Sequence, residues 1–167
     1  MNIKKLPSQQ LLKEHFDYVD GQLVWKKTYS KAKSGKPIGW VEKNGYVCAN
    51  LNGTRYRVHR LVFMYFNGFC PDFIDHIDGN KQNNSIENLR QANTHENACN
   101  RSPNKNNKLQ IKGVCFDQNK FKANIKKFGK SYHLGYFQTK EEAAKAYVEA
   151  AQNFHGEFAW KNLIKNN

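Results

Sequence analysis

Apolar residues in the first part of the chain recur in short segments separated by polar turns. Over residues 6–16 they follow helical spacing, and Ser8 can cap the first turn, so we expect a short helix there. Aromatic and β-branched segments follow, and residues 17–58 are predicted to form a small antiparallel sheet. The expected hairpin turns, which tolerate positive φ, are Asp20-Gly21, Asn44-Gly45 and Asn52-Gly53.

The middle of the chain changes from continuous apolar residues to a polar loop. Residues 59–66 are apolar at nearly every position and are followed by Asn67-Gly68, which predicts a buried helix and its end. Residues 73–90 predict a short strand, a long polar loop and a second short strand. Asn93, with Glu96 three residues later, then fits a capping box and predicts a helix start.

The last third has the pattern of a second module. Residues 101–110 are rich in Asn and Lys, which predicts a linker. Apolar and polar residues alternate in three short segments of residues 113–137, which predicts three strands. Thr139 with Glu142 can cap an Ala-rich helix after them. We therefore expect an α+β protein with a first domain over 1–100, a basic linker over 101–110 and a three-stranded antiparallel sheet packed on one helix over 111–167.

Charge points to an anionic partner. The 167 residues carry 27 Lys and Arg against 14 Asp and Glu, a formal net charge of +13. Residues 101–139 alone hold nine basic side chains against Asp117, so the second module is expected to be the stronger anion binder. No apolar run approaches the roughly 18 residues of a membrane helix, so a membrane span is excluded. Because of its charge, nucleic acid is the favoured partner of the chain.

The N-terminus and the cysteines give the expected compartment. The first 15 residues carry charge and Gln where a signal peptide needs apolar residues, so we expect an intracellular, cytoplasmic protein. Cys48, Cys70, Cys99 and Cys115 should then be reduced thiols. They include no C-x-x-C pair, so neither a zinc ribbon nor a redox motif is indicated.

Asp75, His76 and Asn97 form a candidate catalytic site. Asp75-His76 ends a predicted strand, and Asn97 follows His76 by 21 residues on a predicted helix. Carboxylate and carboxamide oxygens are hard ligands that suit Mg²⁺, with Mn²⁺ as the alternative ion. A neutral His beside such an ion can take a proton from a water that attacks phosphorus. The pair alone could equally be a surface turn.

These residues resemble a known family. Asp75-His76, the segment Asn83 to Arg90 and the segment Glu96 to Asn100 resemble the HNH nucleases, specifically phage and intron-type homing endonucleases with a ββα-metal fold. The resemblance implies that His76 is the general base and that Asp75 and Asn97 hold the metal. It implies that Asn88 braces the loop, and it leaves open whether His95 assists.

The C-terminal part has its own resemblance. Gly113-Val114, residues 120–125, Leu134 to Phe137 and the segment from Glu141 to Gly156 resemble the AP2/ERF DNA-binding domain over about residues 111–163. That family reads the major groove with its sheet. At its base-reading positions this chain carries other residues, so the family's sequence preference does not transfer: Cys115, Asn124, Lys126, Ser131 and His133.

DNA contacts are expected on both modules. Lys122, Asn124 and Lys126 share one face of a predicted strand, although a charge run can also be merely solvated. Neutralising phosphates there would make binding strongly salt-dependent. The full set of expected DNA-binding residues is His59, Arg60, Arg90, Arg101, Lys120, Lys122, Asn124, Lys126, Lys127 and His133.

The predicted function is a metal-dependent DNA endonuclease of homing type, which cuts or nicks duplex DNA at a site chosen by the C-terminal domain. The alternative from another class is a DNA-binding regulator without catalysis. An RNA-binding or RNA-cleaving protein rests on charge alone. Two different modules in one chain suit an asymmetric target, which favours a monomer over a homodimer.

Overall fold

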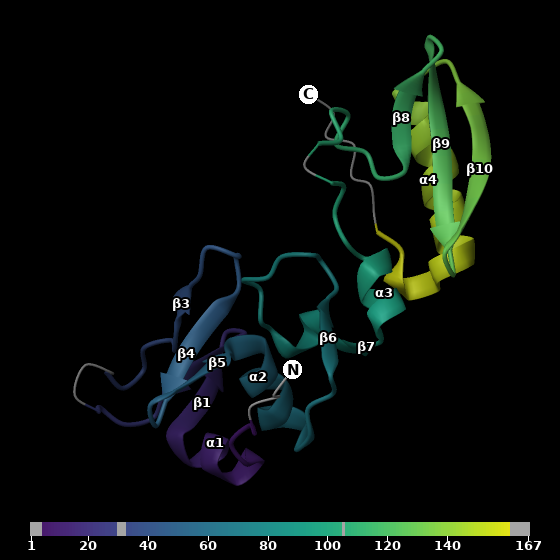
Figure 1. Cartoon of the computed structure of the whole chain (residues 1–167). Helices are drawn as coiled ribbons and strands as arrows, with labels where there is room; N and C mark the ends of the chain where they lie inside the picture. Colours follow the sequence, from purple (N-terminus) through teal and green to yellow (C-terminus); the bar gives the residue numbers. More distant parts are fainter. Residues whose placement is uncertain (1–4, 30–32, 105, 161–167) are drawn as a thin grey trace. The chain divides into compact units, whose positions relative to one another are not determined.

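The computed structural model describes residues 5–29, 33–104 and 106–160 (Figure 1). The chain divides into two compact units, Met1–Ala92 and Asn93–Asn167, each with its own apolar core. The first unit contains α1 (Gln9–His15), β1 (Phe16–Val19), β2 (Gln22–Trp25), β3 (Trp40–Val41), β4 (Val47–Leu51), β5 (Thr54–Arg57), α2 (Val58–Asn67), β6 (Phe73–His76), the 3-10 helix η1 (Ile86–Asn88) and β7 (Leu89–Ala92). The second contains α3 (Thr94–Cys99), β8 (Val114–Asp117), β9 (Lys120–Lys127), β10 (Lys130–Phe137), α4 (Lys140–His155) and the 3-10 helix η2 (Gly156–Phe158).

Most local signals in the first unit are confirmed. The exception is Asn44-Gly45, where only Gly45 has positive φ and residues 42–46 form a longer loop between β3 and β4. The Ser8 side chain accepts a hydrogen bond from the Leu11 backbone and caps α1. Asp20-Gly21 and Asn52-Gly53 adopt positive φ and form the two-residue hairpin turns. Gly68, also with positive φ, ends α2.

The predicted single sheet over residues 17–58 is wrong in its connectivity, because the segment forms two sheets. β1 pairs with β2, while β3, β4 and β5 form a separate three-stranded sheet. Beyond β1, β2 meets residues 35–38 through an isolated bridge between Val24 and Pro37 and through backbone hydrogen bonds from Ile38 N to Leu23 O, from Trp25 N to Lys36 O and from Gly35 N to Trp25 O, without forming a strand there. Proline has no N–H to donate, so it interrupts a strand ladder at this point.

The core of the first unit sits between α1, α2 and these small sheets. Its fully buried side chains include Leu12 from α1, Phe16 from β1 and Leu61 and Val62 from α2. Burial of α2 agrees with the continuous apolar pattern of residues 59–66. The helix thereby fixes its first turn, which carries His59, against the β6–β7 hairpin.

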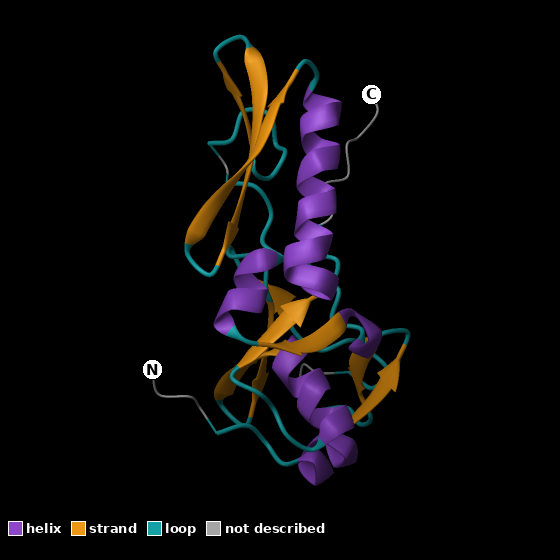
Figure 2. Cartoon of the chain, turned by 90° about the vertical axis from the view of Figure 1, so that its right-hand side faces the viewer, coloured by secondary structure: helices purple, strands orange, loops and turns teal. Residues whose placement is uncertain are grey.

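The second unit is a three-stranded antiparallel sheet of order β10-β9-β8 with α4 along one face (Figure 2). Ala143, Ala144 and Ala151 of α4 are buried against Ala123 and Ile125 of β9, and these small side chains allow helix and sheet to approach closely. The expected three strands and one helix are confirmed. Capping boxes at Asn93–Glu96 and Thr139–Glu142 begin α3 and α4 as predicted.

The compact units divide after Ala92, whereas the sequence placed the first boundary after residue 100. Described residues within 101–110 contain turns but no helix or strand. The domain boundaries remain a prediction. Among the described residues, no helix combines the length and the apolar character needed to cross a bilayer.

Candidate active site

The β6–β7 hairpin places a carboxylate and an imidazole at the end of a strand. Asp75 pairs with Arg90 across the hairpin, and His76 pairs with Leu89. Both Asp75 and His76 are 5% exposed. The Arg90 guanidinium donates from Nε and Nη2 to Asp75 Oδ2 at 2.9 and 2.7 Å. Such a buried, doubly bonded pair fixes the orientation of the carboxylate.

The His76 ring is held in a buried and polar setting. Its Nε2 lies 3.1 Å from Oδ1 of Asn84, which is itself buried. Burial lowers the pKa of His76, while the bond to Asn84 and the charges of Asp78 and Asp75 act in the opposite direction. The ring is therefore neutral at neutral pH and keeps a lone pair that can accept a proton.

Asn88 braces the loop between β6 and β7. Its Oδ1 accepts from the Asp78 backbone at 3.0 Å, and its Nδ2 donates to Asp78 Oδ1 at 2.9 Å and to the Asn83 carbonyl at 2.8 Å. The second Asp78 oxygen accepts from Asn83 Nδ2 at 2.8 Å. Burial raises the pKa of Asp78, but bonds from Asn83, Asn88 and the Asn80 backbone outweigh it, so the net shift is downward.

His59 joins the site from the first turn of α2. Its ring centroid lies 5.1 Å from that of His76, edge to face, and the Tyr46 ring lies near both at 5.4 and 6.1 Å. Burial lowers the pKa of His59 to about 3, and the next cause is the neighbouring His76, because two protonated rings so close together would repel each other. Its buried Nδ1 has no hydrogen-bond partner among the described residues. His59 was predicted to contact DNA, whereas the structure buries it beside His76.

Two exposed cations border the same site, and sequence analysis missed both. The Arg57 guanidinium lies 4.3 Å from the Tyr46 ring centroid, and Lys81 Nζ lies 4.6 Å from it. Lys81 Nζ also donates to the Asn44 carbonyl at 3.0 Å. Positive charge is thus held beside the imidazole pair by stacking on one aromatic ring. Tyr46 directly follows the predicted Asn44-Gly45 turn, which is the only signal the sequence offered.

The other expected residues of the HNH-like part are distributed as follows. Arg60 donates to the Asp72 carbonyl at 3.1 Å, and Arg90 is engaged by Asp75. Asn97 lies on α3 in the second unit, so its pairing with Asp75 as a metal ligand stays a prediction. On the same helix, His95 lies beside Cys99 and is described below.

The second unit gathers the expected base-reading residues on one face of its sheet. Register places Asn124 opposite His133 and Lys126 opposite Ser131, while Ala123 and Ile125 face α4. Lys122 pairs with Cys115 on the same face, and Lys120 has the same parity along β9. Lys127 points to the other face, where its Nζ lies 4.8 Å from the Phe154 ring centroid. Arg101 is exposed after α3.

The donor set of the first unit fits a hard cation. Asp75 offers a carboxylate whose orientation Arg90 fixes, and oxygen donors of this kind suit Mg²⁺. His76 beside it is neutral and can act as a base. The arrangement can therefore bring an activated water and a cation to one phosphate.

Comparison with known proteins identifies the relatives of this chain. The sequence profile of the HNH endonuclease family matches residues 56–99, which include His59, Asp75, His76, Asn88 and Asn97. Protein 3.8 of Escherichia phage T7 is 32% identical over 107 residues, which cover 62% of this chain and 88% of that protein. No solved structure matches the chain significantly.

Two proteins of Acanthamoeba polyphaga mimivirus are also similar. The uncharacterized HNH endonuclease L560 is 34% identical over 128 residues, 75% of this chain and 66% of that protein. The uncharacterized HNH endonuclease L245 is 40% identical over 73 residues, 40% of this chain and 22% of that protein. The chain thus spans less than two thirds of the length of both. The profile match falls on the residues of the buried site, and both mimivirus relatives are named as HNH endonucleases, so residues 56–99 of the chain form an HNH endonuclease domain.

Proposed function

We propose that the chain is a metal-dependent endonuclease that hydrolyses phosphodiester bonds in duplex DNA. The observation that carries the proposal is the buried, neutral His76 beside the oriented carboxylate of Asp75, inside the segment that matches the HNH family. A net charge of +13 supports a polyanionic substrate.

In the proposed reaction His76 is the general base. Its ring accepts a proton from water, the water oxygen forms a bond to phosphorus, and the bond from phosphorus to the 3′ oxygen breaks. The departing 3′ oxygen takes a proton from a solvent water. The products are a 5′-phosphate and a 3′-hydroxyl. Asn84 fixes the His76 ring by a hydrogen bond. Asn88 fixes the surrounding loop by donating to Asp78 and to the Asn83 carbonyl. Such positioning contributes because the base must lie within hydrogen-bond reach of the water.

Asp75 and Asn97 are the proposed ligands of the divalent ion. When bound, Mg²⁺ would neutralise charge on the phosphate and on the departing oxygen, and Mn²⁺ would supply the same chemistry. Arg90 keeps one Asp75 oxygen hydrogen-bonded and so limits the rotation of the carboxylate. His59 fills the space behind His76 and keeps it desolvated.

Substrate binding is assigned to two surfaces. Arg57 and Lys81 beside Tyr46 are suited to the phosphate at the reacting site. The sheet face that carries Lys122, Asn124 and Lys126 is suited to target selection, in the manner of an AP2/ERF-like sheet in the major groove. We further propose a ββα-metal arrangement, a homing-type role and nicking by a monomer.

Plasmid cleavage tests the proposal. Supercoiled plasmid and DNA from the source of the chain are incubated with the protein in Mg²⁺, in Mn²⁺ and in EDTA. We expect metal-dependent nicked circles, and His76→Ala should slow cleavage by about 10²- to 10⁴-fold. His15→Ala is the matched control, because His15 lies on α1 and outside this site. Linear product at comparable rate would indicate paired active sites instead of a monomer.

Two outcomes would overturn the proposal. Full cleavage by His76→Ala would remove His76 from the mechanism. Tight DNA binding with no cleavage in either metal would establish the regulator instead. Competition between duplex DNA and structured RNA distinguishes the substrate class, since the charge alone serves both.

A further inference from the structure

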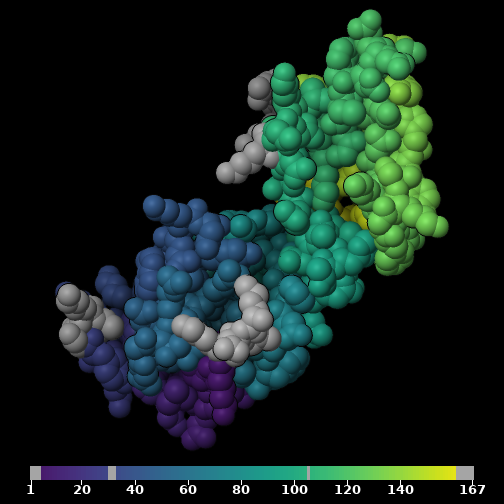
Figure 3. Space-filling view, in the orientation of Figure 1, coloured from purple at the N-terminus to yellow at the C-terminus, as the bar shows by residue number. Residues whose placement is uncertain are grey.

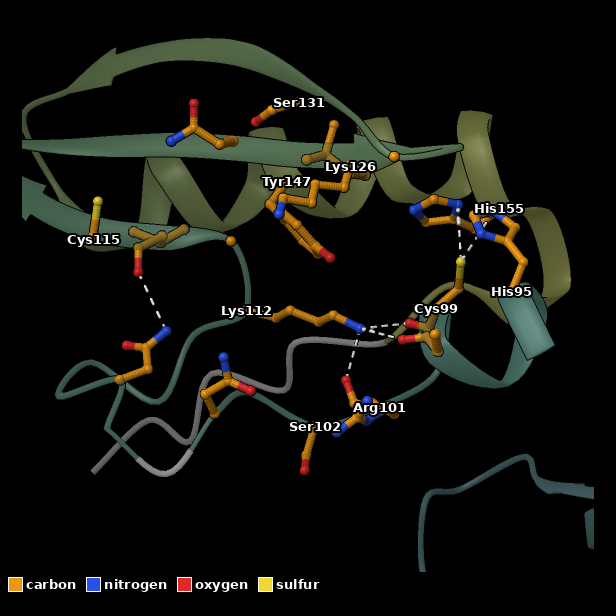
Figure 4. A pocket seen from close by; sticks show the side chains of 18 of the residues that line it. His95, Cys99, Arg101, Ser102, Lys112, Cys115, Lys126, Ser131, Tyr147 and His155 are labelled. Atoms are coloured by element: carbon orange, nitrogen blue, oxygen red, sulfur yellow. Dashed lines mark hydrogen bonds between the residues drawn. The ribbon is translucent and has the colours of Figure 1, made fainter. Parts of the chain in front are cut away.

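A cluster of soft metal ligands lies in the second unit, apart from the residues assigned to catalysis. His95, Cys99 and His155 each offer one ligand atom, and these atoms all lie within 4.8 Å of one another. Cys99 Sγ lies 3.7 Å from His95 Nε2 and 3.3 Å from His155 Nδ1 (Figure 4). Three potential ligand atoms from two helices thus converge on one point, as they do in a metal site.

We propose that His95, Cys99 and His155 bind a Zn²⁺ ion that joins α3 to the C-terminal end of α4. Zinc prefers thiolate and imidazole ligands in a tetrahedral arrangement. At Zn–S of about 2.3 Å and Zn–N of about 2.0–2.1 Å, tetrahedral geometry separates sulfur from nitrogen by roughly 3.6 Å. The two sulfur-to-nitrogen distances fall on either side of that value.

The helices explain why these side chains meet. His95 and Cys99 are four residues apart on α3 and therefore share one face of the helix. His155 is the last residue of α4, where Gly156 ends the helix. Asn97 projects from nearly the opposite side of α3, since two residues rotate by about 200°. The proposed zinc ligands and the proposed magnesium ligand thus use different faces of α3.

The surroundings fit a bound metal. The His95 ring stacks on Phe128 with centroids 4.8 Å apart, which restricts its orientation. Lys112 Nζ donates to the carbonyls of Cys99 and Arg101 at 2.6 and 2.7 Å, and so fixes the end of α3 (Figure 4). Burial raises the pKa of the Cys99 thiol, with the Lys112 charge acting against it. Cys99 therefore releases its proton to solvent as the sulfur–metal bond forms.

The site has an entry path. All three residues line a pocket of about 640 Å³ in the second unit, together with Lys112 and Tyr147. In the space-filling view, yellow atoms near the end of α4 are visible in a hollow between the green atoms of preceding segments (Figure 3). Three protein ligands leave a fourth tetrahedral position, and water from this pocket can take it.

Cobalt substitution tests the proposal on the full chain. The protein is stripped of metal with EDTA, kept reduced and titrated with Co²⁺, whose bond to a thiolate gives a charge-transfer absorption in the near ultraviolet. We expect this absorption to saturate at one ion per chain and to disappear when Zn²⁺ displaces Co²⁺. Magnesium at an oxygen site gives no such signal, so the readout is independent of nuclease activity.

Variants assign the ligands. Cys99→Ser should abolish the charge-transfer absorption, and His95→Ala or His155→Ala should weaken Co²⁺ binding by at least about 100-fold. The matched controls are Cys115→Ser and His133→Ala. Cys115 is an exposed cysteine of β8, and His133 is a histidine of β10 outside the proposed ligand set. Both control variants should bind Co²⁺ with the affinity of the wild type. Circular dichroism shows whether each variant is folded.

Two results would overturn the zinc site. One is a wild-type titration without thiolate absorption, which does not depend on any variant folding. The other is an absorption that persists in Cys99→Ser or disappears in Cys115→Ser. In addition, Zn²⁺ should raise the Tm of the wild type but not of His155→Ala, because an ion that binds only the folded state stabilises it.

Discussion

The β6–β7 hairpin and the cluster at the end of α4 both use histidine, but they are built in different ways. The hydrogen bonds that position His76 and its loop come from Asn84, Asn88 and Asp78, all within 15 positions of it, while the rings of His59 and Tyr46 pack beside it from earlier in the chain. His95 and Cys99 meet His155 only because α4 packs on the sheet of the second unit. The hydrogen bonds of the first site lie within one loop, whereas the second site is assembled only by packing over a long sequence separation.

The largest stability effect is expected at the buried ion pair of the first site. Arg90→Met removes the guanidinium from Asp75, and an uncompensated buried carboxylate costs about 3–5 kcal/mol. Urea unfolding measures the loss. Arg55→Met is the control: Arg55 is 62% exposed in its pair with Glu42, so the loss should stay below about 1 kcal/mol. Equal losses in the two variants would contradict the role given to burial.

In the second unit, packing at Gly113 should matter more than polar bonds. Gly113 has positive φ, and an added Cβ would overlap the Tyr147 ring and the Asn124 carbonyl. Backbone strain and overpacking together should lower the free energy of unfolding of Gly113→Ala by roughly 2–5 kcal/mol. Gly129→Ala has a similar φ but open space, so thermal unfolding should show a loss of only about 1–2 kcal/mol. A larger loss of stability in Gly129→Ala than in Gly113→Ala would contradict the role given to packing around Gly113.

Asn88→Ala tests the polar network by itself. Its side chain makes three hydrogen bonds across the loop, and leaving those partners unsatisfied should cost about 1–3 kcal/mol. Cleavage should fall as well, because the loop no longer fixes Asp78 and Asn83. Asn50→Ala, at an exposed position of β4, should change the free energy of unfolding by less than about 0.5 kcal/mol. A neutral result at Asn88 would remove its bracing role.

The smallest effect is a pH dependence. The folded-state pKa of Asp78 is lowered from 3.8, so its contribution to stability is present above that pH and is lost as pH falls through the folded value. Asp78 is exposed, which limits the contribution to less than about 1 kcal/mol. Acid unfolding of Asp78→Asn should therefore be less steep than that of the wild type. Superimposable acid profiles would show that the carboxylate adds nothing.

Short-range features of this fold were predictable because their causes lie within a few residues. The hairpin turn Asp20-Gly21 and the capping box Asn93–Glu96 follow from local φ preferences and side-chain reach. Asp75 and His76 were found from residue type and spacing, Asn88 was implied by the resemblance to the HNH nucleases, and the structure brings all three into one hairpin. The division of residues 17–58 into two sheets was missed, because strand pairing depends on contacts that spacing does not encode.

Residues contributed from a distance could not be predicted. His59 was expected to contact DNA, but the burial of α2 places it beside His76. The cysteines form no C-x-x-C pair, so the sequence did not indicate a zinc site, whereas the cluster combines Cys99 with His155, 56 residues later. The one local signal was the i, i+4 spacing of His95 and Cys99, which is also common on ordinary helices.

Phe128 shows how the turn between β9 and β10 is constrained. It has φ of 47° and is 75% exposed, although this two-residue turn, completed by Gly129, favours Asn before Gly. A bulky aromatic residue in the left-handed region lowers the stability of the turn, yet its ring covers His95. Folding and ligand orientation therefore place opposite demands on one position, and an engineer who installs Asn at residue 128 exchanges a firmer hairpin for a freer imidazole.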